Sequence, residues 1–379
     1  MKIAYLSVLP PPGEAAVSGV HKVSETLLRE FETFPDLQVE AVTMIDDLPR
    51  ETCIQRGHVR THYLSCKPQG KTWTFYASEI RRLKAKIREL EVPFVHGQPT
   101  AEFLLAATGS GLPHVITIHG LVSRESAGKR WWQPETIANG IRERLNRKAI
   151  ARAANIISLS PYVQDYLTGR ATGRVWPISN PIDREFFDVL EKPLQGLNIL
   201  CVGIVSTRKN QELLVRACAV LNRSGRPFQC RVVGKFSPGY DDKIKSLVQE
   251  LGLASRVEIT GPVSREELFA SYDWATAVVL PSREETSPLS LIQGLAARRA
   301  VFGANAAGIP RLLDDGTLGT LFDGENPDSL AARLTEYLDN PEPFREKARI
   351  GRLEAEKSFH PVGVARQTIE TYRRILAGA

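Results

Sequence analysis

Two stretches in the second half of the chain place charged side chains where a helix is expected to begin. The first, at 278–303, reads VVLPSREETSPLSLIQGLAARRAVFG, in which a buried apolar run leads into a loop with Glu284 and Glu285. Ser287 is predicted to cap the following helix and Pro288 to occupy its first position, where a missing N–H costs nothing. Exposed N–H groups at such a helix start can bind phosphate. Alternatively, Glu284 and Glu285 serve only to complement the helix dipole.

The second stretch, at 201–217, reads CVGIVSTRKNQELLVRA and carries the adjacent cations Arg208 and Lys209 between a strand and a helix. Fixed cations of this kind stabilise the negative charge that develops on a departing diphosphate, and they do so without a metal ion. The sequence contains no D-x-D motif, so no metal site is predicted. A pair of solvated loop cations is the alternative interpretation.

In the first half of the chain, further polar residues follow predicted strands. His119 comes directly after the apolar run HVITI, and His96 with Gly97 ends another strand in the same way. Gly19 lies in a Pro- and Gly-containing loop before a helix, where it would let a diphosphate approach the backbone. Each of these residues also has a purely structural interpretation. A histidine of unknown surroundings is usually structural, and any strand-to-helix turn can use a glycine.

The elements that must position these residues follow an α/β pattern. Short β-branched apolar runs alternate with amphipathic helical stretches, which is typical of βαβ units and parallel sheets. The predicted strands of the first half are 2–8, 39–45, 59–65, 94–98, 114–120, 155–160 and 174–179, and those of the second half are 197–203, 230–234, 257–261, 275–280, 300–304 and 319–322. The stretch DVLEKPLQG at 188–196 reads as a linker. We therefore expect two Rossmann-like domains, 1–190 and 197–358, that face a central cleft.

Composition narrows the class of protein. The chain has 379 residues, 42% hydrophobic and 24% charged, which is ordinary for a globular protein of two domains. Its five cysteines never fall at C-x-x-C spacing, which argues against a disulfide framework and a zinc site. No apolar run is long enough to cross a bilayer and no secretory signal is evident, so we expect a cytoplasmic protein. The net charge of +6 favours a phosphate-bearing or anionic partner, but no nucleic-acid-binding motif is present.

Taken together, these stretches resemble the family-4 retaining glycosyltransferases, which have the GT-B fold and belong to the glycosyl transferases group 1. Glu285 matches the first carboxylate of the family's E-x7-E region, which in that family contacts the transferred sugar. Gln293 stands where the second Glu normally holds the ribose hydroxyls; it can bind two hydroxyls but brings no charge. Alternatively, Gln293 is simply a helix-face residue.

The cationic loop is similar to the family's glycine, basic loop and K-G element, in which Lys grips the leaving diphosphate. Lys209 matches that Lys, six residues after Gly203. The family's frequent Arg directly after the glycine is Ile204 here, so Arg208 is our candidate for the missing charge. His119 corresponds to the histidine of the T-x-H-G element, which lies beside the donor sugar at the reaction centre.

Further matches extend the resemblance over nearly the whole chain. Gly19 matches one of a glycine pair, with Ser18 in place of the other, and His96 is a second candidate, for the acceptor. The loop at 307–310 reads AGIP, although Arg311 replaces the usual Glu. The end of the chain, from 359 to 379, resembles the terminal helix that packs back on the first domain. Other matching positions are Ser160, Asn180, Asp183, Phe187 and Pro262.

The resemblance implies roles for two groups of residues. The residues expected at the reaction centre are His119, Arg208, Lys209 and Glu285. Those expected to bind the donor nucleotide sugar are Gly19, Gly203, Gly261, Val263, Thr286, Ser287, Pro288, Leu289 and Gln293.

The activity that the resemblance implies is a retaining, metal-independent transfer of a hexosyl unit. The donor would be a UDP- or GDP-type sugar, the acceptor a glycan or a lipid-linked molecule of cell-envelope or exopolysaccharide synthesis, and no further cofactor is expected. The departures at Ile204, Gln293 and Arg311 leave open a catalytically silent scaffold that binds nucleotide sugars. A sugar-nucleotide epimerase on the same architecture is also open.

Two features bear on the acceptor. The segment from Ser78 to Leu90, SEIRRLKAKIREL, is predicted to be a helix that starts at a capping residue and spaces apolar residues between five cations. Such a helix can lie on an anionic membrane surface, or it can be an ordinary domain helix with its polar side in water. Trp131 and Trp132 follow His119 and are candidates for stacking on a sugar, for an interface or for packing.

Overall fold

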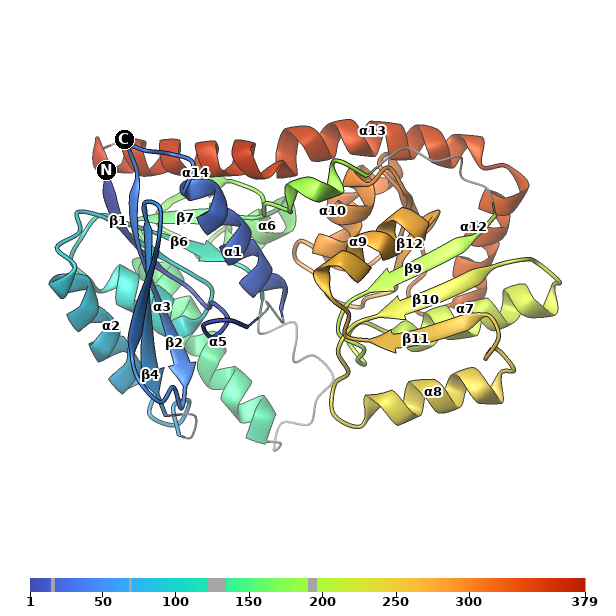
Figure 1. The fold of residues 1–379 in the computed structure, drawn as a ribbon, viewed down its shortest axis with the longest axis horizontal. Helices are drawn as coiled ribbons and strands as arrows, with labels where there is room; N and C mark the ends of the chain where they lie inside the picture. Colours follow the sequence, from blue (N-terminus) through green and yellow to red (C-terminus); the bar gives the residue numbers. More distant parts are fainter. Residues whose placement is uncertain (15–17, 68–69, 122–133, 190–195, 379) are drawn as a thin grey trace. The chain divides into compact units, whose positions relative to one another are not determined.

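The computed structural model divides the chain into two compact units, one of residues 1–181 with 361–379 and one of residues 182–360 (Figure 1). It describes residues 1–14, 18–67, 70–121, 134–189 and 196–378. Trp131 and Trp132 and most of the predicted linker lie outside these ranges. Within the described residues, no helix combines the length and the apolar character that a membrane span requires.

The boundary between the two units, after residue 181, falls earlier in the sequence than the predicted linker at 188–196. The N–H of Ile182 donates to the carbonyl oxygen of Phe359 (3.2 Å), which belongs to the second unit. The ring of Phe186 lies 4.5 Å from the ring of Phe269 and 5.1 Å from that of Tyr272. These contacts fix a short 3₁₀ turn, Arg184–Phe186, to the second unit, so the predicted boundary at residue 190 lies too late in the sequence.

The first unit is built on an eight-stranded sheet with the order β3-β4-β2-β1-β5-β6-β7-β8, parallel except for the edge pair β3 and β4. Its strands are β1 Lys2–Leu6, β2 Gln38–Asp46, β3 Thr52–Arg56, β4 Val59–Cys66, β5 Val95–Gly97, β6 His114–Ile118, β7 Asn155–Ser158 and β8 Arg174–Pro177. Every predicted strand of the first half is present. β3 was not predicted because its sequence TCIQR is polar and largely exposed, so it lacks the buried pattern of the others.

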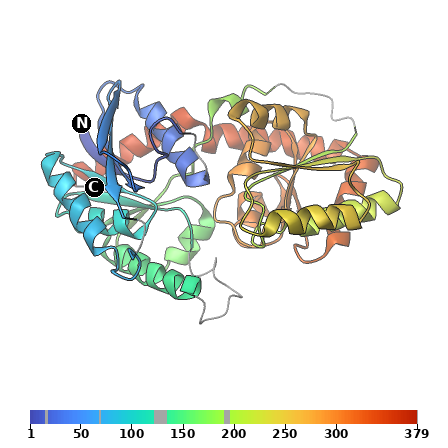
Figure 2. The same ribbon diagram turned by 60° about the horizontal axis from the view of Figure 1, so that its bottom comes forward.

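Helices cover both faces of this sheet (Figure 2). α1 (Gly19–Phe31) and α14 (Pro361–Leu376) contact each other and share one hydrophobic core with β1 and β2. The helices α2 (Ala77–Glu89), α3 (Ala101–Thr108) and α5 (Pro134–Arg152) form a second layer, α2 against α3 and α3 against α5. α6 (Pro161–Leu167) follows β7 and is capped by Ser160, whose Oγ accepts from the Val163 N–H.

A buried polar contact ties α14 to the sheet. His96 at the end of β5 hydrogen-bonds through Nδ1 to the hydroxyl of Tyr372 (2.6 Å) and through Nε2 to the hydroxyl of Thr117 (2.7 Å). Both His96 and Tyr372 are fully buried, and burial lowers the pKa of His96 to about 3. With both ring nitrogens engaged inside the unit, His96 is not available to an acceptor, so that prediction was wrong. The neighbouring Gly97 has a packing role, because a Cβ there would lie 2.7 Å from Cβ of Ala107.

The neutral state of His96 predicts a loss of stability in acid. Because its pKa lies near 3 in the folded chain and near 6.5 in the unfolded chain, only the unfolded chain takes up this proton as the pH falls through 6.5. Between pH 7 and pH 5 this single group should lower the free energy of unfolding by about 2 kcal/mol. Urea unfolding of the wild type and of His96→Gln at both pH values measures the difference. Equal losses in the two proteins would show that His96 is not the source.

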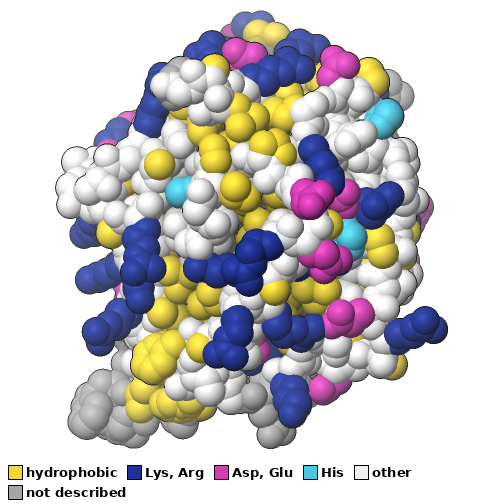
Figure 3. All heavy atoms as spheres, turned by 90° about the vertical axis from the view of Figure 1, so that its left-hand side faces the viewer, with side chains coloured by type: hydrophobic (Ala, Val, Ile, Leu, Met, Phe, Trp, Pro, Cys, Tyr) yellow, Lys and Arg dark blue, Asp and Glu magenta, His cyan; other side chains and the backbone are white. Residues whose placement is uncertain are grey.

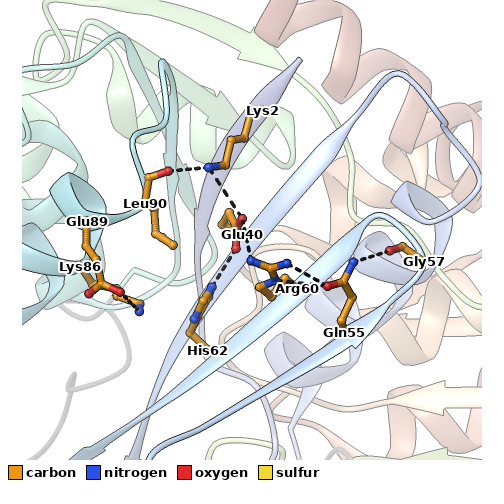
Figure 4. Close-up of polar contacts among 9 residues, drawn as sticks. All are labelled: Lys2, Glu40, Gln55, Gly57, Arg60, His62, Lys86, Glu89 and Leu90. Carbon is orange, nitrogen blue, oxygen red and sulfur yellow. Dashed lines mark hydrogen bonds and ion pairs between the residues drawn. The ribbon is translucent and has the colours of Figure 1, made fainter.

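An ionic cluster joins the strands nearer their amino ends (Figure 4). His62 Nε2 lies 2.7 Å from Glu40 Oε2, and both residues are buried. Lys2 Nζ and Arg60 Nη1 each lie 3.9 Å from Glu40 Oε1, and Lys2 also donates to the carbonyl oxygen of Leu90 (2.6 Å). The cluster therefore links β1, β2 and β4 to the end of α2 and leaves the carboxyl ends of the strands for other functions.

The second unit is a six-stranded, fully parallel sheet with the order β11-β10-β9-β12-β13-β14. Its strands are β9 Asn198–Val202, β10 Gln229–Val233, β11 Val257–Gly261, β12 Ala277–Leu280, β13 Ala300–Ala304 and β14 Thr320–Phe322, all of which the sequence predicted. α7 contacts α8 and α12, and α10 contacts α13. The helices are α7 Gln211–Arg223, α8 Tyr240–Glu250, α9 Arg265–Trp274, α10 Leu289–Ala296, α11 Ile309–Leu312, α12 Pro327–Asp339 and α13 Glu342–Phe359.

Each sheet has one point where the strand order reverses. In the second unit this point lies between β9 and β12, and in the first it lies between β1 and β5. The loops that leave neighbouring strands there diverge to opposite faces, which opens a crevice at the carboxyl ends of the strands. The loops after β9 and β12 carry the predicted cations and carboxylates, so the fold positions them side by side.

Candidate active site

The two loops of the second unit are joined through their backbones. The N–H of Arg283, after β12, donates to the carbonyl oxygen of Arg208, after β9 (2.9 Å). The guanidinium of Arg283 donates to the carbonyl oxygen of Thr207 (2.7 Å) and pairs with Glu325 (3.0 Å). These bonds hold the Arg208 and Lys209 loop against the Glu285 loop, and they come from a residue that the sequence did not single out.

Two of the predicted catalytic side chains, Arg208 and Lys209, contact the carboxylate of a third, Glu285. Lys209 Nζ lies 2.5 Å from Glu285 Oε1, and Arg208 Nη1 lies 3.4 Å from the same oxygen. Arg208 Nη1 also donates to the carbonyl oxygen of Glu284 (2.7 Å). The side chains of Lys209 and Glu285 are only 13% and 9% exposed, so their attraction is little screened by water. Two cations on one carboxylate leave a local excess of positive charge, which suits an anionic ligand.

Glycines end the three strands beside this cluster. Gly203 lies directly under the Lys209 side chain, since a Cβ at Gly203 would be 3.4 Å from Lys209 Cε. The N–H of Gly203 donates to Val233 and that of Gly234 to Gly261, so the three glycines follow neighbouring strands. All three have positive φ (153°, 149° and 75°), a region that favours glycine. The carboxyl edge of β9, β10 and β11 thus presents backbone, with the predicted Val263 half-buried just beyond Gly261.

The start of α10 differs from the prediction. The helix begins at Leu289 with Pro288 in the cap position, and the carbonyl oxygen of Pro288 accepts from the N–H groups of Leu291 and Ile292. Ser287 does not cap the helix, because Pro288 occupies the cap position and the Ser287 hydroxyl has no hydrogen-bond partner in the described residues. The capping role of Ser287 and the placement of Pro288 inside the helix were therefore wrong. Thr286 lies half-buried in the same loop.

Two serines of this loop have buried hydroxyl oxygens. Ser282 is fully buried and Ser287 half-buried, and within the described residues neither hydroxyl oxygen has a hydrogen-bond partner. A buried hydroxyl without a partner costs free energy, so such groups in a folded protein usually await a bound molecule or water. Ser282 was not assigned a role from the sequence, although it lies only three residues before Glu285.

Gln293 lies in a different setting from Glu285. It is buried on α10, and its side-chain oxygen accepts from the hydroxyl of Tyr272 (2.8 Å), which also reaches the carbonyl oxygen of Ser290 (3.1 Å). The structure therefore places Gln293 in a packing contact with α9. Its predicted contact with a ribose remains a prediction, with the side-chain amide nitrogen as the group that would make it.

The backbone of Gly308, in the predicted AGIP loop after β13, contacts the backbone of Glu285. Its N–H donates to the carbonyl oxygen of Glu285 (2.9 Å). A Cβ at Gly308 would lie 2.7 Å from that oxygen and 2.8 Å from the carbonyl oxygen of Thr286, so only glycine fits. Arg311, the departure noted from the sequence, is exposed and lies 3.8 Å from Asp315.

We expect Gly308→Ala to lower transfer by about 10²-fold, because the added methyl displaces the backbone that carries Glu285. Overpacking should also cost about 1–3 kcal/mol of stability. Gly140→Ala is the control, since a Cβ at Gly140 meets nothing within 4 Å. Steady-state transfer rates and urea unfolding of both variants make the measurement. Wild-type activity in Gly308→Ala would refute the supporting role.

In the first unit, His119 follows β6 and contacts Gln98. His119 Nε2 lies 2.6 Å from Gln98 Oε1, and Gln98 Nε2 donates to the hydroxyl of Tyr5. Since an amide oxygen can only accept, His119 Nε2 carries the proton, and burial lowers the His119 pKa to about 3, so the ring is neutral. This tautomer makes Nδ1 the acceptor atom of the ring. Gln98 was predicted only as a strand end, yet it fixes the side chain that the sequence placed at the reaction centre.

The remaining predicted residues, from both units, lie in ordinary structural positions. Gly19 is the exposed first residue of α1, and Ser18, which replaces the family's second glycine, caps this helix by accepting from the N–H of His21 (3.2 Å). In the second unit, Asp183 pairs with Arg265 (3.1 Å). Ile204 is exposed in the loop after β9.

Two family models cover most of the chain. The one described as Glycosyltransferase Family 4 matches residues 17–186, and the one described as Glycosyl transferases group 1 matches residues 183–353. The chain belongs to the family-4, group 1 glycosyltransferases. The predicted family is thereby confirmed, and this glycosyltransferase has the predicted GT-B fold of two Rossmann-like domains.

Relatives of this glycosyltransferase are distant in sequence. It is 25% identical over 339 residues to an MMP alpha-(1->4)-mannosyltransferase of Mycolicibacterium hassiacum, with 86% of this chain and 80% of the relative covered. It is 26% identical over 287 residues to a D-inositol 3-phosphate glycosyltransferase of Paenarthrobacter aurescens, with 71% and 68% covered.

Two solved structures show the same fold. Sucrose-phosphate synthase from Thermosynechococcus elongatus matches with a TM-score of 0.82 and 22% identity over 100% of both chains. Anabaena HepE in complex with UDP and glucose matches with a TM-score of 0.73 and 18% identity, over 99% of this chain and 100% of HepE.

Proposed function

We propose that this glycosyltransferase moves a hexosyl unit from a UDP- or GDP-sugar to a glycan or lipid-linked acceptor, with retention of configuration and without a metal ion. The observation that carries the proposal is the convergence of Lys209 and Arg208 on Glu285 at the reversal point of the second sheet. Cations in a half-buried site beside a helix start are suited to a diphosphate. A carboxylate beside them is suited to sugar hydroxyls.

In the proposed reaction, the donor diphosphate lies against Lys209, Arg208 and the first turn of α10. The bond between the anomeric carbon and the phosphate oxygen breaks, and the negative charge that develops on the diphosphate is stabilised by the two cations. The acceptor oxygen bonds to the anomeric carbon from the same face, and its proton passes to the departing phosphate oxygen. Glu285 orients the sugar through its hydroxyls and forms no covalent intermediate.

The relatives support this class of donor. One carries the name of a mannosyltransferase, others that of a D-inositol 3-phosphate glycosyltransferase, and HepE is described in complex with UDP and glucose. We extend these names to the present chain only as the choice of UDP- and GDP-hexoses for testing. A lipid-linked acceptor of envelope or exopolysaccharide synthesis, met from the cytoplasm at the inner face of the membrane, completes the proposal.

The test is a panel of UDP-, GDP- and ADP-hexoses with crude lipid and glycan acceptors, read out as acceptor-dependent release of nucleotide in the presence of EDTA. The anomeric configuration of the product, measured by NMR, should equal that of the donor. Interconversion of donor sugars with no acceptor present would indicate an epimerase. Binding of a donor with neither release nor interconversion across the panel would indicate a silent scaffold.

A further inference from the structure

The helix that the sequence offered for membrane contact does not present its apolar side to solvent. α2 begins at Ala77, and Tyr76 in the cap position makes no side-chain cap, so Ser78 is not the cap; its hydroxyl donates to Glu79 (2.8 Å). The apolar residues Leu83 and Ile87 are buried, and α2 packs against α3. The apolar stripe therefore belongs to the core of the unit, and lipid contact through it is ruled out.

The opposite side of α2 remains basic and exposed. Arg81 and Arg88 lie two helical turns apart on one face, and within the described residues neither has an ionic or hydrogen-bond partner. Three neighbouring cations are already neutralised by acidic side chains: Lys71 by Asp46, Arg82 by Glu51 and Lys86 by Glu89. Lys84 of the same helix also has no ionic partner in the described residues, but it is half-buried and its Nζ lies against Gly109 at the end of α3. The exposed uncompensated charge of this face thus comes from Arg81 and Arg88.

Two large exposed aromatic side chains lie in the turn that leads into α2. Trp73 and Phe75 are 58% and 51% exposed, and in the described ranges no other aromatic residue is among the exposed large hydrophobic ones. The turn that carries them is ordered: the N–H of Thr74 donates to Gly70, and that of Tyr76 donates to Lys71. The Tyr76 hydroxyl bonds to Thr72 (3.0 Å) and accepts from Arg142 of α5 (3.1 Å). The aromatic pair is therefore held outward on a fixed turn.

We propose that Trp73 and Phe75, together with Arg81 and Arg88 of the helix that follows them, form a docking surface for an anionic lipid bilayer. Exposed aromatic rings enter the headgroup region of a bilayer, where one edge stays wet, and arginines beside them attract acidic headgroups. Figure 3 views the side of the first unit that carries α2 and shows basic side chains around hydrophobic ones. The proposal stands on these residues alone and does not depend on the transfer chemistry.

The expected contributions of the arginines and of the aromatic rings to vesicle binding are large enough to measure. An arginine near an anionic surface strengthens binding about fivefold, and the attraction weakens as salt shortens the Debye length. Loss of both arginines should therefore weaken binding to acidic vesicles by about 25-fold. Loss of both aromatic rings should weaken binding to acidic vesicles by at least about tenfold, since each removes a large apolar area from the headgroup region.

The experiment is co-sedimentation of the full chain with vesicles of equal parts phosphatidylglycerol and phosphatidylcholine, and with pure phosphatidylcholine. The variants are Trp73→Ser with Phe75→Ser, and Arg81→Gln with Arg88→Gln. The matched controls change an exposed leucine and an exposed arginine of the second unit, Leu353→Ser and Arg223→Gln. Circular dichroism of every protein establishes that the fold is kept, which is expected because all four target side chains are exposed.

We expect the wild type and both controls to bind the acidic vesicles at low salt, with binding lost at about 0.5 M salt. Each double variant should show the stated loss. Absence of wild-type binding to acidic vesicles would overturn the proposal, and so would unchanged binding in either double variant. Salt-sensitive binding to heparin without binding to vesicles would also overturn it, because the partner would then be another polyanion.

Discussion

Transfer by Glu285→Gln is expected to fall by about 10³-fold, with nucleoside diphosphate affinity kept within about threefold of the wild type. Both cations contact one oxygen of this carboxylate, which in the proposed reaction holds sugar hydroxyls as the glycosidic bond breaks. Glutamine has the same shape but loses the charge that strengthens these hydrogen bonds. In the proposed site the diphosphate contacts belong to Lys209, Arg208 and α10, so they should survive. Initial rates and calorimetric titration of UDP and GDP make the two measurements.

Glu325→Gln serves as the control for Glu285→Gln. Glu325 is exposed and also pairs with a cation of the same loops, Arg283, so its loss reports on loop support alone. It should keep transfer within about threefold, because an exposed ion pair contributes little to stability. If Glu285→Gln retained wild-type transfer, Glu285 would have no part in the reaction. An equal fall in transfer and in UDP affinity would mean instead that Glu285 supports the nucleotide site.

Replacement of Lys209 by methionine should affect both binding and transfer. A charge-assisted hydrogen bond contributes about 1.5–3 kcal/mol, so Lys209→Met should weaken UDP or GDP binding by about 10- to 100-fold. Transfer should fall further, by about 10³-fold in all, because the cation is needed most when charge develops on the leaving diphosphate. Met keeps the length of the side chain that packs over Gly203. Titration of the nucleotides and initial rates separate the two effects.

Measurements of unfolding free energy separate the effect of the Lys209–Glu285 ion pair on stability from the proposed role of Lys209 in catalysis. Lys209→Met leaves the nearly buried Glu285 carboxylate with Arg208 alone, which should cost about 2 kcal/mol. The double variant Lys209→Met with Glu285→Gln removes the unpaired charge and should recover most of this loss, because the two effects are not additive in a contacting pair. Its transfer should stay as low as that of the single variants. Recovery of transfer together with stability would show that Lys209 acts only through the fold.

The fold could be predicted from the sequence because parallel strands covered on both faces are apolar over their whole length. Every predicted strand is present for this reason. β3 escaped prediction because an exposed edge strand carries polar residues, and only its pairing with β4 makes it a strand. The domain boundary was misplaced because the turn at Arg184–Phe186 docks through aromatic contacts that are distant in sequence.

The candidate site could be predicted in part, where its residues lie in loops that follow recognisable strands. Arg208, Lys209 and Glu285 are such residues, and the structure brings them together. The contact of Gln98 with His119 could not be predicted, because it depends on which way two loops turn after β5 and β6. The sequence identifies Gly308 only as part of the AGIP loop. Its close contact with the backbone of Glu285 is known only from the distance between a Cβ at Gly308 and the Glu285 carbonyl oxygen. The roles of these residues in transfer stay predictions until the variants are measured.

Calorimetric titration of UDP and GDP into the full chain is the most direct test, because it needs neither the acceptor nor the sugar to be known. Lys243→Met is the reference variant, since this exposed lysine of the same unit pairs with Glu212 (2.7 Å) and not with Glu285. At least one nucleotide should bind the wild type and Lys243→Met alike and bind Lys209→Met at least about tenfold more weakly. Equal affinity of Lys209→Met and the wild type for a nucleotide that binds would contradict a diphosphate site at the carboxyl ends of β9 and β12.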